Sequence, residues 1–224
     1  MIVLHHLENS RSLRVVWLLE ELGVDYDIQL YRRDPKTMLA PESLKQVHPL
    51  GKSPLITDQH QAGRVVAESG AIIEYLLRHY DREQALSPPV DSEAYDDYVF
   101  WMHHAEASAM PPLVMNLVFG RLSKPPVPAL VRPLGKMFAK GVKEQYLGPE
   151  IRRLIGFWEQ HLAEHSWFAG ETFSAADIQM SFPLLALEGR GMLSDHPALT
   201  RFLEQARTRP AYGRATEKGG ELSL

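Results

Sequence analysis

The sequence of 224 residues predicts an α/β unit at residues 1–81 followed by an all-helical unit at residues 91–224. Strand and helix patterns alternate up to residue 81, whereas only helical spacing of apolar residues occurs beyond residue 91. Residues 82–90 between the two units contain Pro88 and Pro89, which is typical of a linker.

The first unit opens with a strand, a helix and a second strand. Residues 1–6 (MIVLHH) and residues 26–31 (YDIQLY) are short strand-like runs. Between them, residues 10–22 carry apolar side chains at helical spacing, and Gly23 follows where a left-handed residue commonly ends a helix. So short a βαβ segment indicates two parallel strands.

The first unit continues with a strand pair and a helix. Residues 53–57 and 64–67 are strand-like and flank a turn-like polar segment, which favours antiparallel pairing. Residues 69–80 form an amphipathic helical pattern with Ser69 as a candidate N-cap. We therefore expect a mixed sheet in the order βαβ-ββα.

The second unit is predicted to contain only helices. Residues 91–118 are predicted to form one long helix that breaks near Pro111 and Pro112, because proline lacks the backbone N–H and crowds the preceding turn. At a later helix start, Ser174 and Asp177 have the spacing of a capping box, which is a structural motif. The remaining helical patterns cover residues 129–145, 149–165, 174–188 and 197–207.

The composition narrows the possible functions. The formal net charge of −4 provides no general attraction to nucleic acid or acidic membranes, and we expect neither as a partner. No apolar run approaches the roughly 18 residues of a membrane-spanning helix, and MIVLHHLENS lacks the regions of a signal peptide. The lack of cysteine excludes disulfides, thiolate metal ligands and a thiol nucleophile on the chain. We expect a cytoplasmic protein without a metal.

Three stretches in order point to a family. They are HPLGKSPLI at residues 48–56, ESGAIIEYL at residues 68–76 and WFAGETFSAADIQMSFPL at residues 167–184. In this order and spacing the sequence resembles the cytosolic glutathione transferases, and L..SRS.R..WLLEELG near its start resembles a bacterial and fungal, theta-like branch. The resemblance implies a thioredoxin-like N-terminal domain, an all-α helical-bundle C-terminal domain, a homodimer and glutathione as co-substrate.

The resemblance also implies which residues bind glutathione. Ser53 precedes Pro54, which is cis in the family, and its backbone would pair with the cysteinyl unit. Glu68 and Ser69 would hold the γ-glutamyl ammonium and carboxylate, because a helix N-terminus favours an anion. Lys52 would pair with the glycyl carboxylate as a point charge. The structural alternatives are an edge proline, a plain helix cap and a solvated lysine.

A single hydroxyl near the first helix is expected to stabilise the glutathione thiolate. The family uses tyrosine, serine or cysteine there, but the chain has no cysteine and no tyrosine before Tyr26. Alignment on the Arg-Val-Val run that begins at Arg14 places Ser10 at the catalytic position, with Asn9 and Ser12 as alternatives. A hydrogen bond to a charged group contributes about 1.5–3 kcal/mol, which lowers a thiol pKa by roughly one to two units.

The second unit is expected to complete the site. Glu106 in HHAEAS resembles an acid that reaches the glutathione of the partner subunit. The electrophile pocket in the family lies against the same long helix, and apolar side chains at this spacing are also typical of a simple core. The candidate lining residues are Met110, Leu113, Met115 and Phe119.

The resulting hypothesis is a detoxifying glutathione transferase that adds the thiolate to a small hydrophobic electrophile, or reduces an organic peroxide with it. Two alternatives stay open. One is a non-catalytic binding or interaction module of the same fold, which the retention of Ser10, Ser53-Pro54 and Glu68-Ser69 disfavours. The other is a glutathione-dependent isomerase, which the lack of a Ser-Ser-Cys cluster disfavours.

Overall fold

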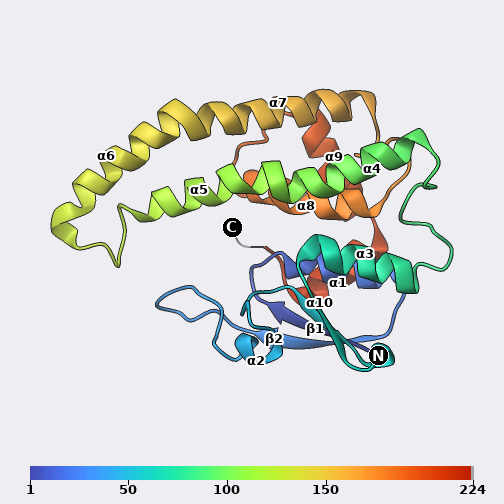
Figure 1. Cartoon of the computed structure of the whole chain (residues 1–224). Coiled ribbons are helices and arrows are strands. Elements are labelled where there is room, and N and C mark those ends of the chain that lie inside the picture. Colours follow the sequence, from blue (N-terminus) through green and yellow to red (C-terminus); the bar gives the residue numbers. More distant parts are fainter. Residues whose placement is uncertain (223–224) are drawn as a thin grey trace.

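The computed structural model describes residues 1–222 and consists of a sheet-containing unit and a helical unit packed on it (Figure 1). The sheet has the strand order β2-β1-β3-β4. β1 runs parallel to β2 and antiparallel to β3, and β4 is antiparallel to β3, so the predicted mixed sheet is confirmed. The elements of this unit are β1 (Ile2–Leu7), α1 (Ser12–Leu22), β2 (Tyr26–Tyr31), α2 (Leu44–Val47), β3 (Leu55–Asp58), β4 (Arg64–Ala67) and α3 (Ser69–Tyr80).

The central strand β1 and helix α1 bring the start of the chain into the core. Ile2 and Leu4 of β1 are fully buried, as are Val15 and Val16 of α1, because the sheet lies on one side and the helical unit on the other. Gly23 ends α1 with a φ of 61°, as predicted. The loop between β1 and α1 is thereby held at the boundary of the two units.

The second unit is helical throughout its described part, as predicted, and the last two residues of the expected unit 91–224 lie outside the described residues. The capping box at Ser174 and Asp177 is formed, and Ser174 N–H donates to Asp177 Oδ2 at 2.8 Å. The helices are α4 (Glu93–His104), α5 (Met110–Arg121), α6 (Arg132–Val142), α7 (Gly148–Glu164), α8 (Ala175–Glu188), α9 (Pro197–Arg207) and α10 (Pro210–Gly219). Helix α10 returns to the first unit and packs along α1.

The predicted break at Pro111 and Pro112 takes another form. A π-helical turn at Ala105–Ala109 joins α4 directly to α5, and the two prolines occupy the first turn of α5. Widening the turn before the prolines accommodates the missing N–H groups and the ring crowding without interrupting the helix. The prolines therefore shape the long helix rather than end it.

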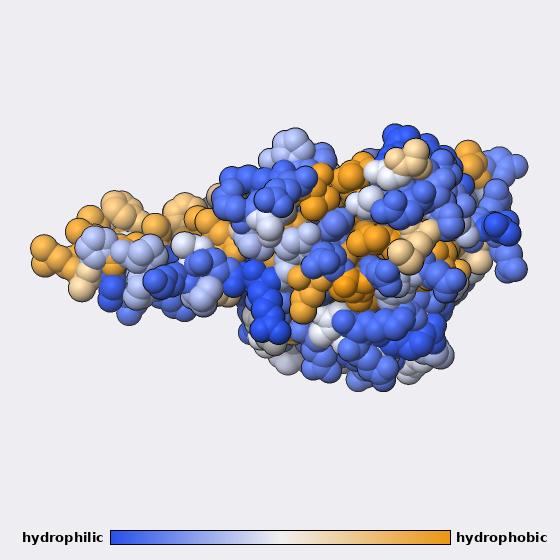
Figure 2. All heavy atoms as spheres, turned by 90° about the horizontal axis from the view of Figure 1, so that it is seen from below, coloured by the Kyte–Doolittle hydropathy of each residue, from blue (hydrophilic) through white to orange (hydrophobic). Residues whose placement is uncertain are grey.

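Helices α5 and α6 form an arm that projects from the body of the protein (Figure 1). Among the described residues, α6 has no buried side chain, and Leu130 just before it is 92% exposed. Figure 2 shows hydrophobic residues on this arm as well as polar ones. Within residues 1–222, no helix combines the length and apolar content needed to span a bilayer.

Candidate active site

A cavity of about 530 Å³ opens between the two units beside the carboxyl end of β1. Its first wall consists of the β1–α1 loop, the segment from the end of β2 into α2, and the segment that leads into β3. Its second wall consists of α5 and α8. The lining residues include Asn9, Ser10, Arg11, Lys52 and Ser53 on the first wall and Met110, Leu113, Val114, Leu117 and Phe182 on the second.

Ser10 sits at this cavity beside the N-terminal end of α1 and is 7% exposed. Its hydroxyl lies 2.7 Å from the Leu7 carbonyl and 2.8 Å from Ser12 Oγ, and its oxygen accepts the Ser12 N–H at 3.2 Å. Asn9 also lines the cavity, with its backbone in the left-handed region at a φ of 48°. Ser12 is fully buried and does not line the cavity, so the two serines are not equivalent.

Ser53 ties the segment before β3 to the end of β1. Its hydroxyl donates to the His5 carbonyl at 2.9 Å and accepts the Leu7 N–H at 3.2 Å. These bonds extend the contact between the two segments past Pro54, which has no N–H to offer. The Ser53–Pro54 peptide bond is cis, as the resemblance implied, and Lys52 lies exposed beside it at the cavity.

Glu68 and Ser69 lie at the junction of β4 and α3, as predicted, but Glu68 occupies the N-cap position and Ser69 is the first residue of α3, so the prediction that Ser69 is the N-cap is wrong. Glu68 is exposed and has a φ of 72°, in the left-handed region that few side chains adopt. Ser69 is 5% exposed, and its Oγ accepts a hydrogen bond from Arg14 Nη2 at 3.3 Å. Since the Arg14 guanidinium only donates, the Ser69 hydroxyl keeps its own hydrogen for another acceptor.

Arg14 is a further functional candidate, which in the sequence stands out only as the start of the Arg-Val-Val run. It is 2% exposed, and its guanidinium also donates to Glu106 Oε1 at 2.5 Å and to the Gln179 carbonyl at 2.8 Å. Burial lowers the pKa of Arg14 to about 10, against the charge of Glu106, so it stays cationic at neutral pH. A signal was present in the sequence, because a charge inside the apolar run LRVVW needs a buried partner.

Glu106 lies in the π-helical turn and pairs with α1 of its own chain. Its carboxylate binds Arg11 Nη1 at 3.1 Å as well as Arg14, while its side chain stays 31% exposed. One glutamate thus joins the helical unit both to Arg11, which lines the cavity, and to Arg14, which contacts Ser69. The expectation that it reaches a second subunit is not tested by a single chain.

Only part of the expected electrophile pocket lines this cavity. Met110 and Leu113 do, and Val114 and Leu117 join them because residues at intervals of three and four share one face of a helix. Met115 is 38% exposed, and neither it nor Phe119 is among the lining residues, since both project from other faces of α5.

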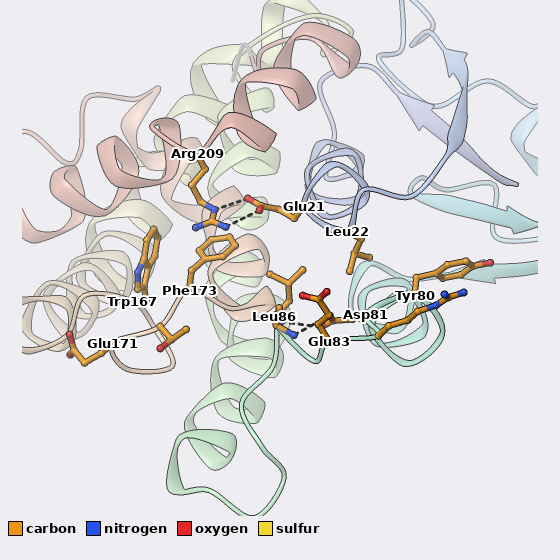
Figure 3. Close-up of a pocket in the computed structure, with 13 residues that line it drawn as sticks. Glu21, Leu22, Tyr80, Asp81, Glu83, Leu86, Trp167, Glu171, Phe173 and Arg209 are labelled. Atoms are coloured by element: carbon orange, nitrogen blue, oxygen red, sulfur yellow. Dashed lines mark hydrogen bonds and ion pairs between the residues drawn. The ribbon is translucent and has the colours of Figure 1, made fainter.

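A second cavity, of about 730 Å³, lies at the linker between the units and contains none of the predicted site residues. Figure 3 shows Arg209 between the carboxylate of Glu21 and the ring of Phe173. Arg209 binds Glu21 at 2.6 and 2.8 Å and lies 3.6 Å from the Phe173 ring centroid. Its charge is therefore already used in joining α1 to the helical unit. No grouping of three or more potential metal ligands occurs within residues 1–222.

Comparison with known proteins agrees with this architecture. Residues 1–78 match the family model described as the N-terminal domain of glutathione S-transferase, and residues 112–210 match that of the C-terminal domain. Glutathione S-transferase 3 of Schizosaccharomyces pombe is 41% identical in an alignment that covers 100% of this chain and 90% of that protein.

Solved structures show the same likeness. A glutathione S-transferase from Actinobacillus pleuropneumoniae superposes with a TM-score of 0.80 and 38% identity, over 100% of this chain and 96% of that one. A sphingomonad glutathione S-transferase complexed with glutathione shares the fold, with a TM-score of 0.74 and 22% identity over 97% and 98% of the two chains. The thioredoxin-like first domain and the helical second domain are thus confirmed. The chain belongs to the glutathione S-transferase family of enzymes.

Proposed function

We propose that the protein binds glutathione along the first wall of the cavity and adds its thiolate to a hydrophobic electrophile held by the second wall. One observation carries the proposal: Ser10, beside the N-terminal end of α1, faces a cavity whose opposite wall is apolar. Glutathione is the co-substrate, and the sphingomonad enzyme of the same fold is complexed with it.

The ends of glutathione find complementary groups beside the cavity. The γ-glutamyl carboxylate accepts from Ser69 and from the N-terminal N–H groups of α3, while Glu68 pairs with the ammonium. The buried cation of Arg14 behind Ser69 adds positive potential at the carboxylate. At the other end Lys52 pairs with the glycyl carboxylate, and the Ser53 backbone pairs with the cysteinyl unit between them.

Ser10 is the group that stabilises the thiolate. A free thiol of this type has a pKa of about 8.5, so only a few per cent is ionised at neutral pH. When glutathione binds, the Ser10 hydroxyl turns from the Leu7 carbonyl and donates to the sulfur. The nearby end of α1 adds a further 0.3–1 kcal/mol or so in favour of the anion. Holding both reactants at one cavity supplies the rest of the rate enhancement.

Asn9 is the main rival of Ser10, because it also lines the cavity. Ser12 is the weaker rival, because it lies behind Ser10 and away from the cavity. The same thiolate would attack the O–O bond of an organic peroxide, so conjugation and peroxide reduction need no separate site. We further propose a cytoplasmic homodimer in which Glu106 also approaches the glutathione of the second subunit, and we keep the domain limits at residues 81 and 91 as a prediction.

The test combines binding, turnover and thiol ionisation. We expect retention on immobilised glutathione, conjugation of glutathione to a chromogenic aryl halide, and a bound thiol whose pKa, followed by ultraviolet thiolate absorbance, lies one to two units below that of free glutathione. Ser10→Ala should abolish most of this shift. The matched control is Ser181→Ala, which also removes a buried hydroxyl bonded to a carbonyl but lies outside the cavity.

Each other outcome assigns a different function. If Asn9→Ala rather than Ser10→Ala removes the shift, Asn9 is the donor. If millimolar glutathione does not bind, the protein is a non-catalytic module. Turnover of a maleylacetoacetate-type substrate without net consumption of glutathione would identify an isomerase.

A further inference from the structure

A chain of buried hydrogen bonds leads from the cavity to the last turn of α10. Ser10 Oγ lies 2.8 Å from Ser12 Oγ, and Ser12 Oγ lies 2.7 Å from His6 Nδ1. On the far side of its ring, His6 Nε2 lies 2.8 Å from the carbonyl oxygen of Gly219. Ser12 is fully buried and His6 is 1% exposed, so solvent takes no part in the chain.

The direction of each bond follows from the groups at its ends. A carbonyl oxygen only accepts, so His6 Nε2 carries the hydrogen and, in the neutral ring, Nδ1 accepts. Ser12 Oγ also lies 3.2 Å from the Leu7 carbonyl, but His6 Nδ1 at 2.7 Å is the nearer acceptor for its single hydroxyl hydrogen. When Ser12 donates to His6, it can only accept from Ser10. Whenever Ser10 donates to Ser12 rather than to the Leu7 carbonyl, every hydrogen in the chain points from the cavity towards His6.

The two ends of this chain coincide with the ends of two helices. Ser10 lies beside the N-terminal end of α1, where backbone N–H groups favour a negative charge. Gly219 is the last residue of α10, and the carbonyls at a helix C-terminus favour a positive charge. A proton that moves from the Ser10 end to the His6 end therefore leaves each charge at the helix end that stabilises it.

The surroundings of His6 are apolar. Burial lowers the pKa of His6, opposed by the bond to the Gly219 carbonyl, so the ring is neutral in the unliganded protein. Leu30 of β2 lies opposite His6 in the sheet, and Leu13 and Val16 of α1 pack with it around Gly219. Charged side chains near His6 on α1, α10 and the π-helical turn form the pairs Arg14–Glu106, Arg11–Glu106, Arg209–Glu21, Arg214–Glu20 and Lys218–Glu20. Glu217 of α10 is exposed to solvent. The Tyr26 hydroxyl of β2 donates to Glu20.

We propose that His6 accepts the proton of the glutathione thiol through Ser10 and Ser12. The S–H bond of glutathione breaks as its proton goes to Ser10 Oγ, the Ser10 proton passes to Ser12 Oγ, and the Ser12 proton forms the new N–H bond at His6 Nδ1. The products are a thiolate at the cavity and an imidazolium between Ser12 and Gly219, with no change in total charge. A cysteine–histidine pair ionises in the same sense when the two groups are in direct contact. The inference rests on the proposed role of Ser10.

After the proton transfer, the hydrogen bonds of the relay point the other way and stabilise the thiolate. Once His6 is protonated, its Nδ1–H donates to Ser12, Ser12 donates to Ser10, and the Ser10 hydrogen is directed at the sulfur. Ser10 then no longer shares its hydrogen with the Leu7 carbonyl. The relay therefore explains how a serine that is bonded internally in the free protein becomes a donor to the bound thiolate.

The most direct test needs no substitution in the relay. The ring nitrogens of His6 are followed by nitrogen-15 NMR in the full chain, with the signal assigned through its bonds to the His6 backbone. Glutathione should convert His6 to an imidazolium at neutral pH, whereas S-methylglutathione, which has no thiol proton, should leave it neutral. A His6 ring that stays neutral with glutathione while the bound thiol is ionised would overturn the proposal.

Two variants provide an independent test. Ser12→Ala breaks the chain, and His6→Asn keeps an acceptor near the Nδ1 position but takes no proton. Each should raise the pKa of bound glutathione by about one unit, which is a tenfold loss of thiolate, while the affinity for S-methylglutathione changes less than about twofold. The matched control is His161→Asn, because His161 Nε2 also bonds only a carbonyl, that of Phe168 at 2.9 Å.

The outcomes separate this inference from the proposed function. If Ser10→Ala raises the thiol pKa but Ser12→Ala and His6→Asn do not, Ser10 acts alone, and His6 only holds α10 in place. If Ser10→Ala has no effect either, the assignment of Ser10 itself fails. Should His6→Asn not fold, Ser12→Ala and the NMR experiment on the unaltered chain still decide.

Discussion

The two walls of the active-site cavity are built on different principles. On the first wall, Ser10 and Ser53 form hydrogen bonds of defined direction to the backbone, and Ser69 beside the cavity accepts one from Arg14. On the second wall, Met110 and Leu113 present apolar surface with no polar partner to satisfy. Directional bonds select one ligand, whereas adaptable apolar side chains accept many of similar size. The contrast supports the proposed function, in which the thiol substrate is fixed and the electrophile varies.

The largest effect is expected at the buried cation behind the first wall. Arg14→Met leaves Glu106 without its closest partner and removes a donor from Ser69, so the free energy of unfolding should fall by about 3 kcal/mol and glutathione affinity should fall with it. Urea denaturation and titration calorimetry measure the two effects.

A matched substitution isolates burial as the cause. Arg207→Met removes an equally short pair with Glu188, but that pair lies at the surface and should contribute under about 1 kcal/mol. Equal losses in the free energy of unfolding for Arg14→Met and Arg207→Met would show that burial does not strengthen the Arg14 pair.

A substitution in the second wall should change the KM for the electrophile and leave the KM for glutathione unchanged. Leu113→Ala truncates a side chain that is 6% exposed, so stability should fall by about 2 kcal/mol and KM for a hydrophobic electrophile should rise severalfold. The KM for glutathione should be unchanged. Met115→Ala is the control on the same helix, since Met115 does not line the cavity. A parallel rise in both KM values for Leu113→Ala would contradict the division into two walls.

The contacts of Glu20 on α1 with residues of α10 and β2 predict that the stability of the protein falls at acid pH. Burial raises the pKa of Glu20, but hydrogen bonds from Lys218, Tyr26 and Arg214 outweigh it and lower the pKa to about 2. Because the unfolded value is near 4.3, this contribution is complete above about pH 5 and is lost as the pH falls towards 2.

The size of this effect is smaller than that at Arg14, because Lys218 and Arg214 are half exposed and water screens them. Glu20→Gln should lower the free energy of unfolding by roughly 1–2 kcal/mol at pH 7 and by about half as much near pH 3. Denaturation of both proteins across this range measures the difference. A gap that stays constant with pH would mean that Glu20 acts through packing and not through its charge.

The smallest effect is expected on the projecting arm. Leu130→Ser alters a side chain that is 92% exposed, so the free energy of unfolding should change by less than about 0.5 kcal/mol, with no change in glutathione affinity. A larger loss that depends on protein concentration would reveal that another copy of the chain covers the arm.

Most of the fold follows from local patterns in the sequence. The strands, the helix ending at Gly23 and the capping box at Ser174 depend on residues close in the chain, and all three occur as predicted. The long helix near Pro111 differs from the prediction, because it continues where a break was expected. Proline affects the turn that precedes it, and one widened turn costs less free energy than unwinding the helix. That choice also sets the place of Glu106 within the widened turn.

The structure brings some of the predicted site residues together at one cavity. Residues next to recognisable motifs, such as Ser10, Ser53 and Met110, do line one cavity. Met115 and Phe119 do not line it, because the rotation of α5 about its axis relative to the neighbouring elements decides which residues face the cavity. Arg14 was missed as a functional candidate because its partners lie 55, 92 and 165 positions away along the chain.

The sequence by itself determined the order of the strands and of most helices, the family, and the absence of a thiol on the protein, whereas helices α2 and α10 were not predicted. Only the tertiary structure decided what the two serines near the start of the first helix contact. Ser10 lines the cavity, while Ser12 points inward and bonds His6. The Nε2 of His6 bonds the carbonyl of Gly219, 213 residues further along the sequence. The physical reason is that hydrogen bonds act through space, so a residue's chemistry depends on neighbours that only the packing of β1, α1 and α10 brings together.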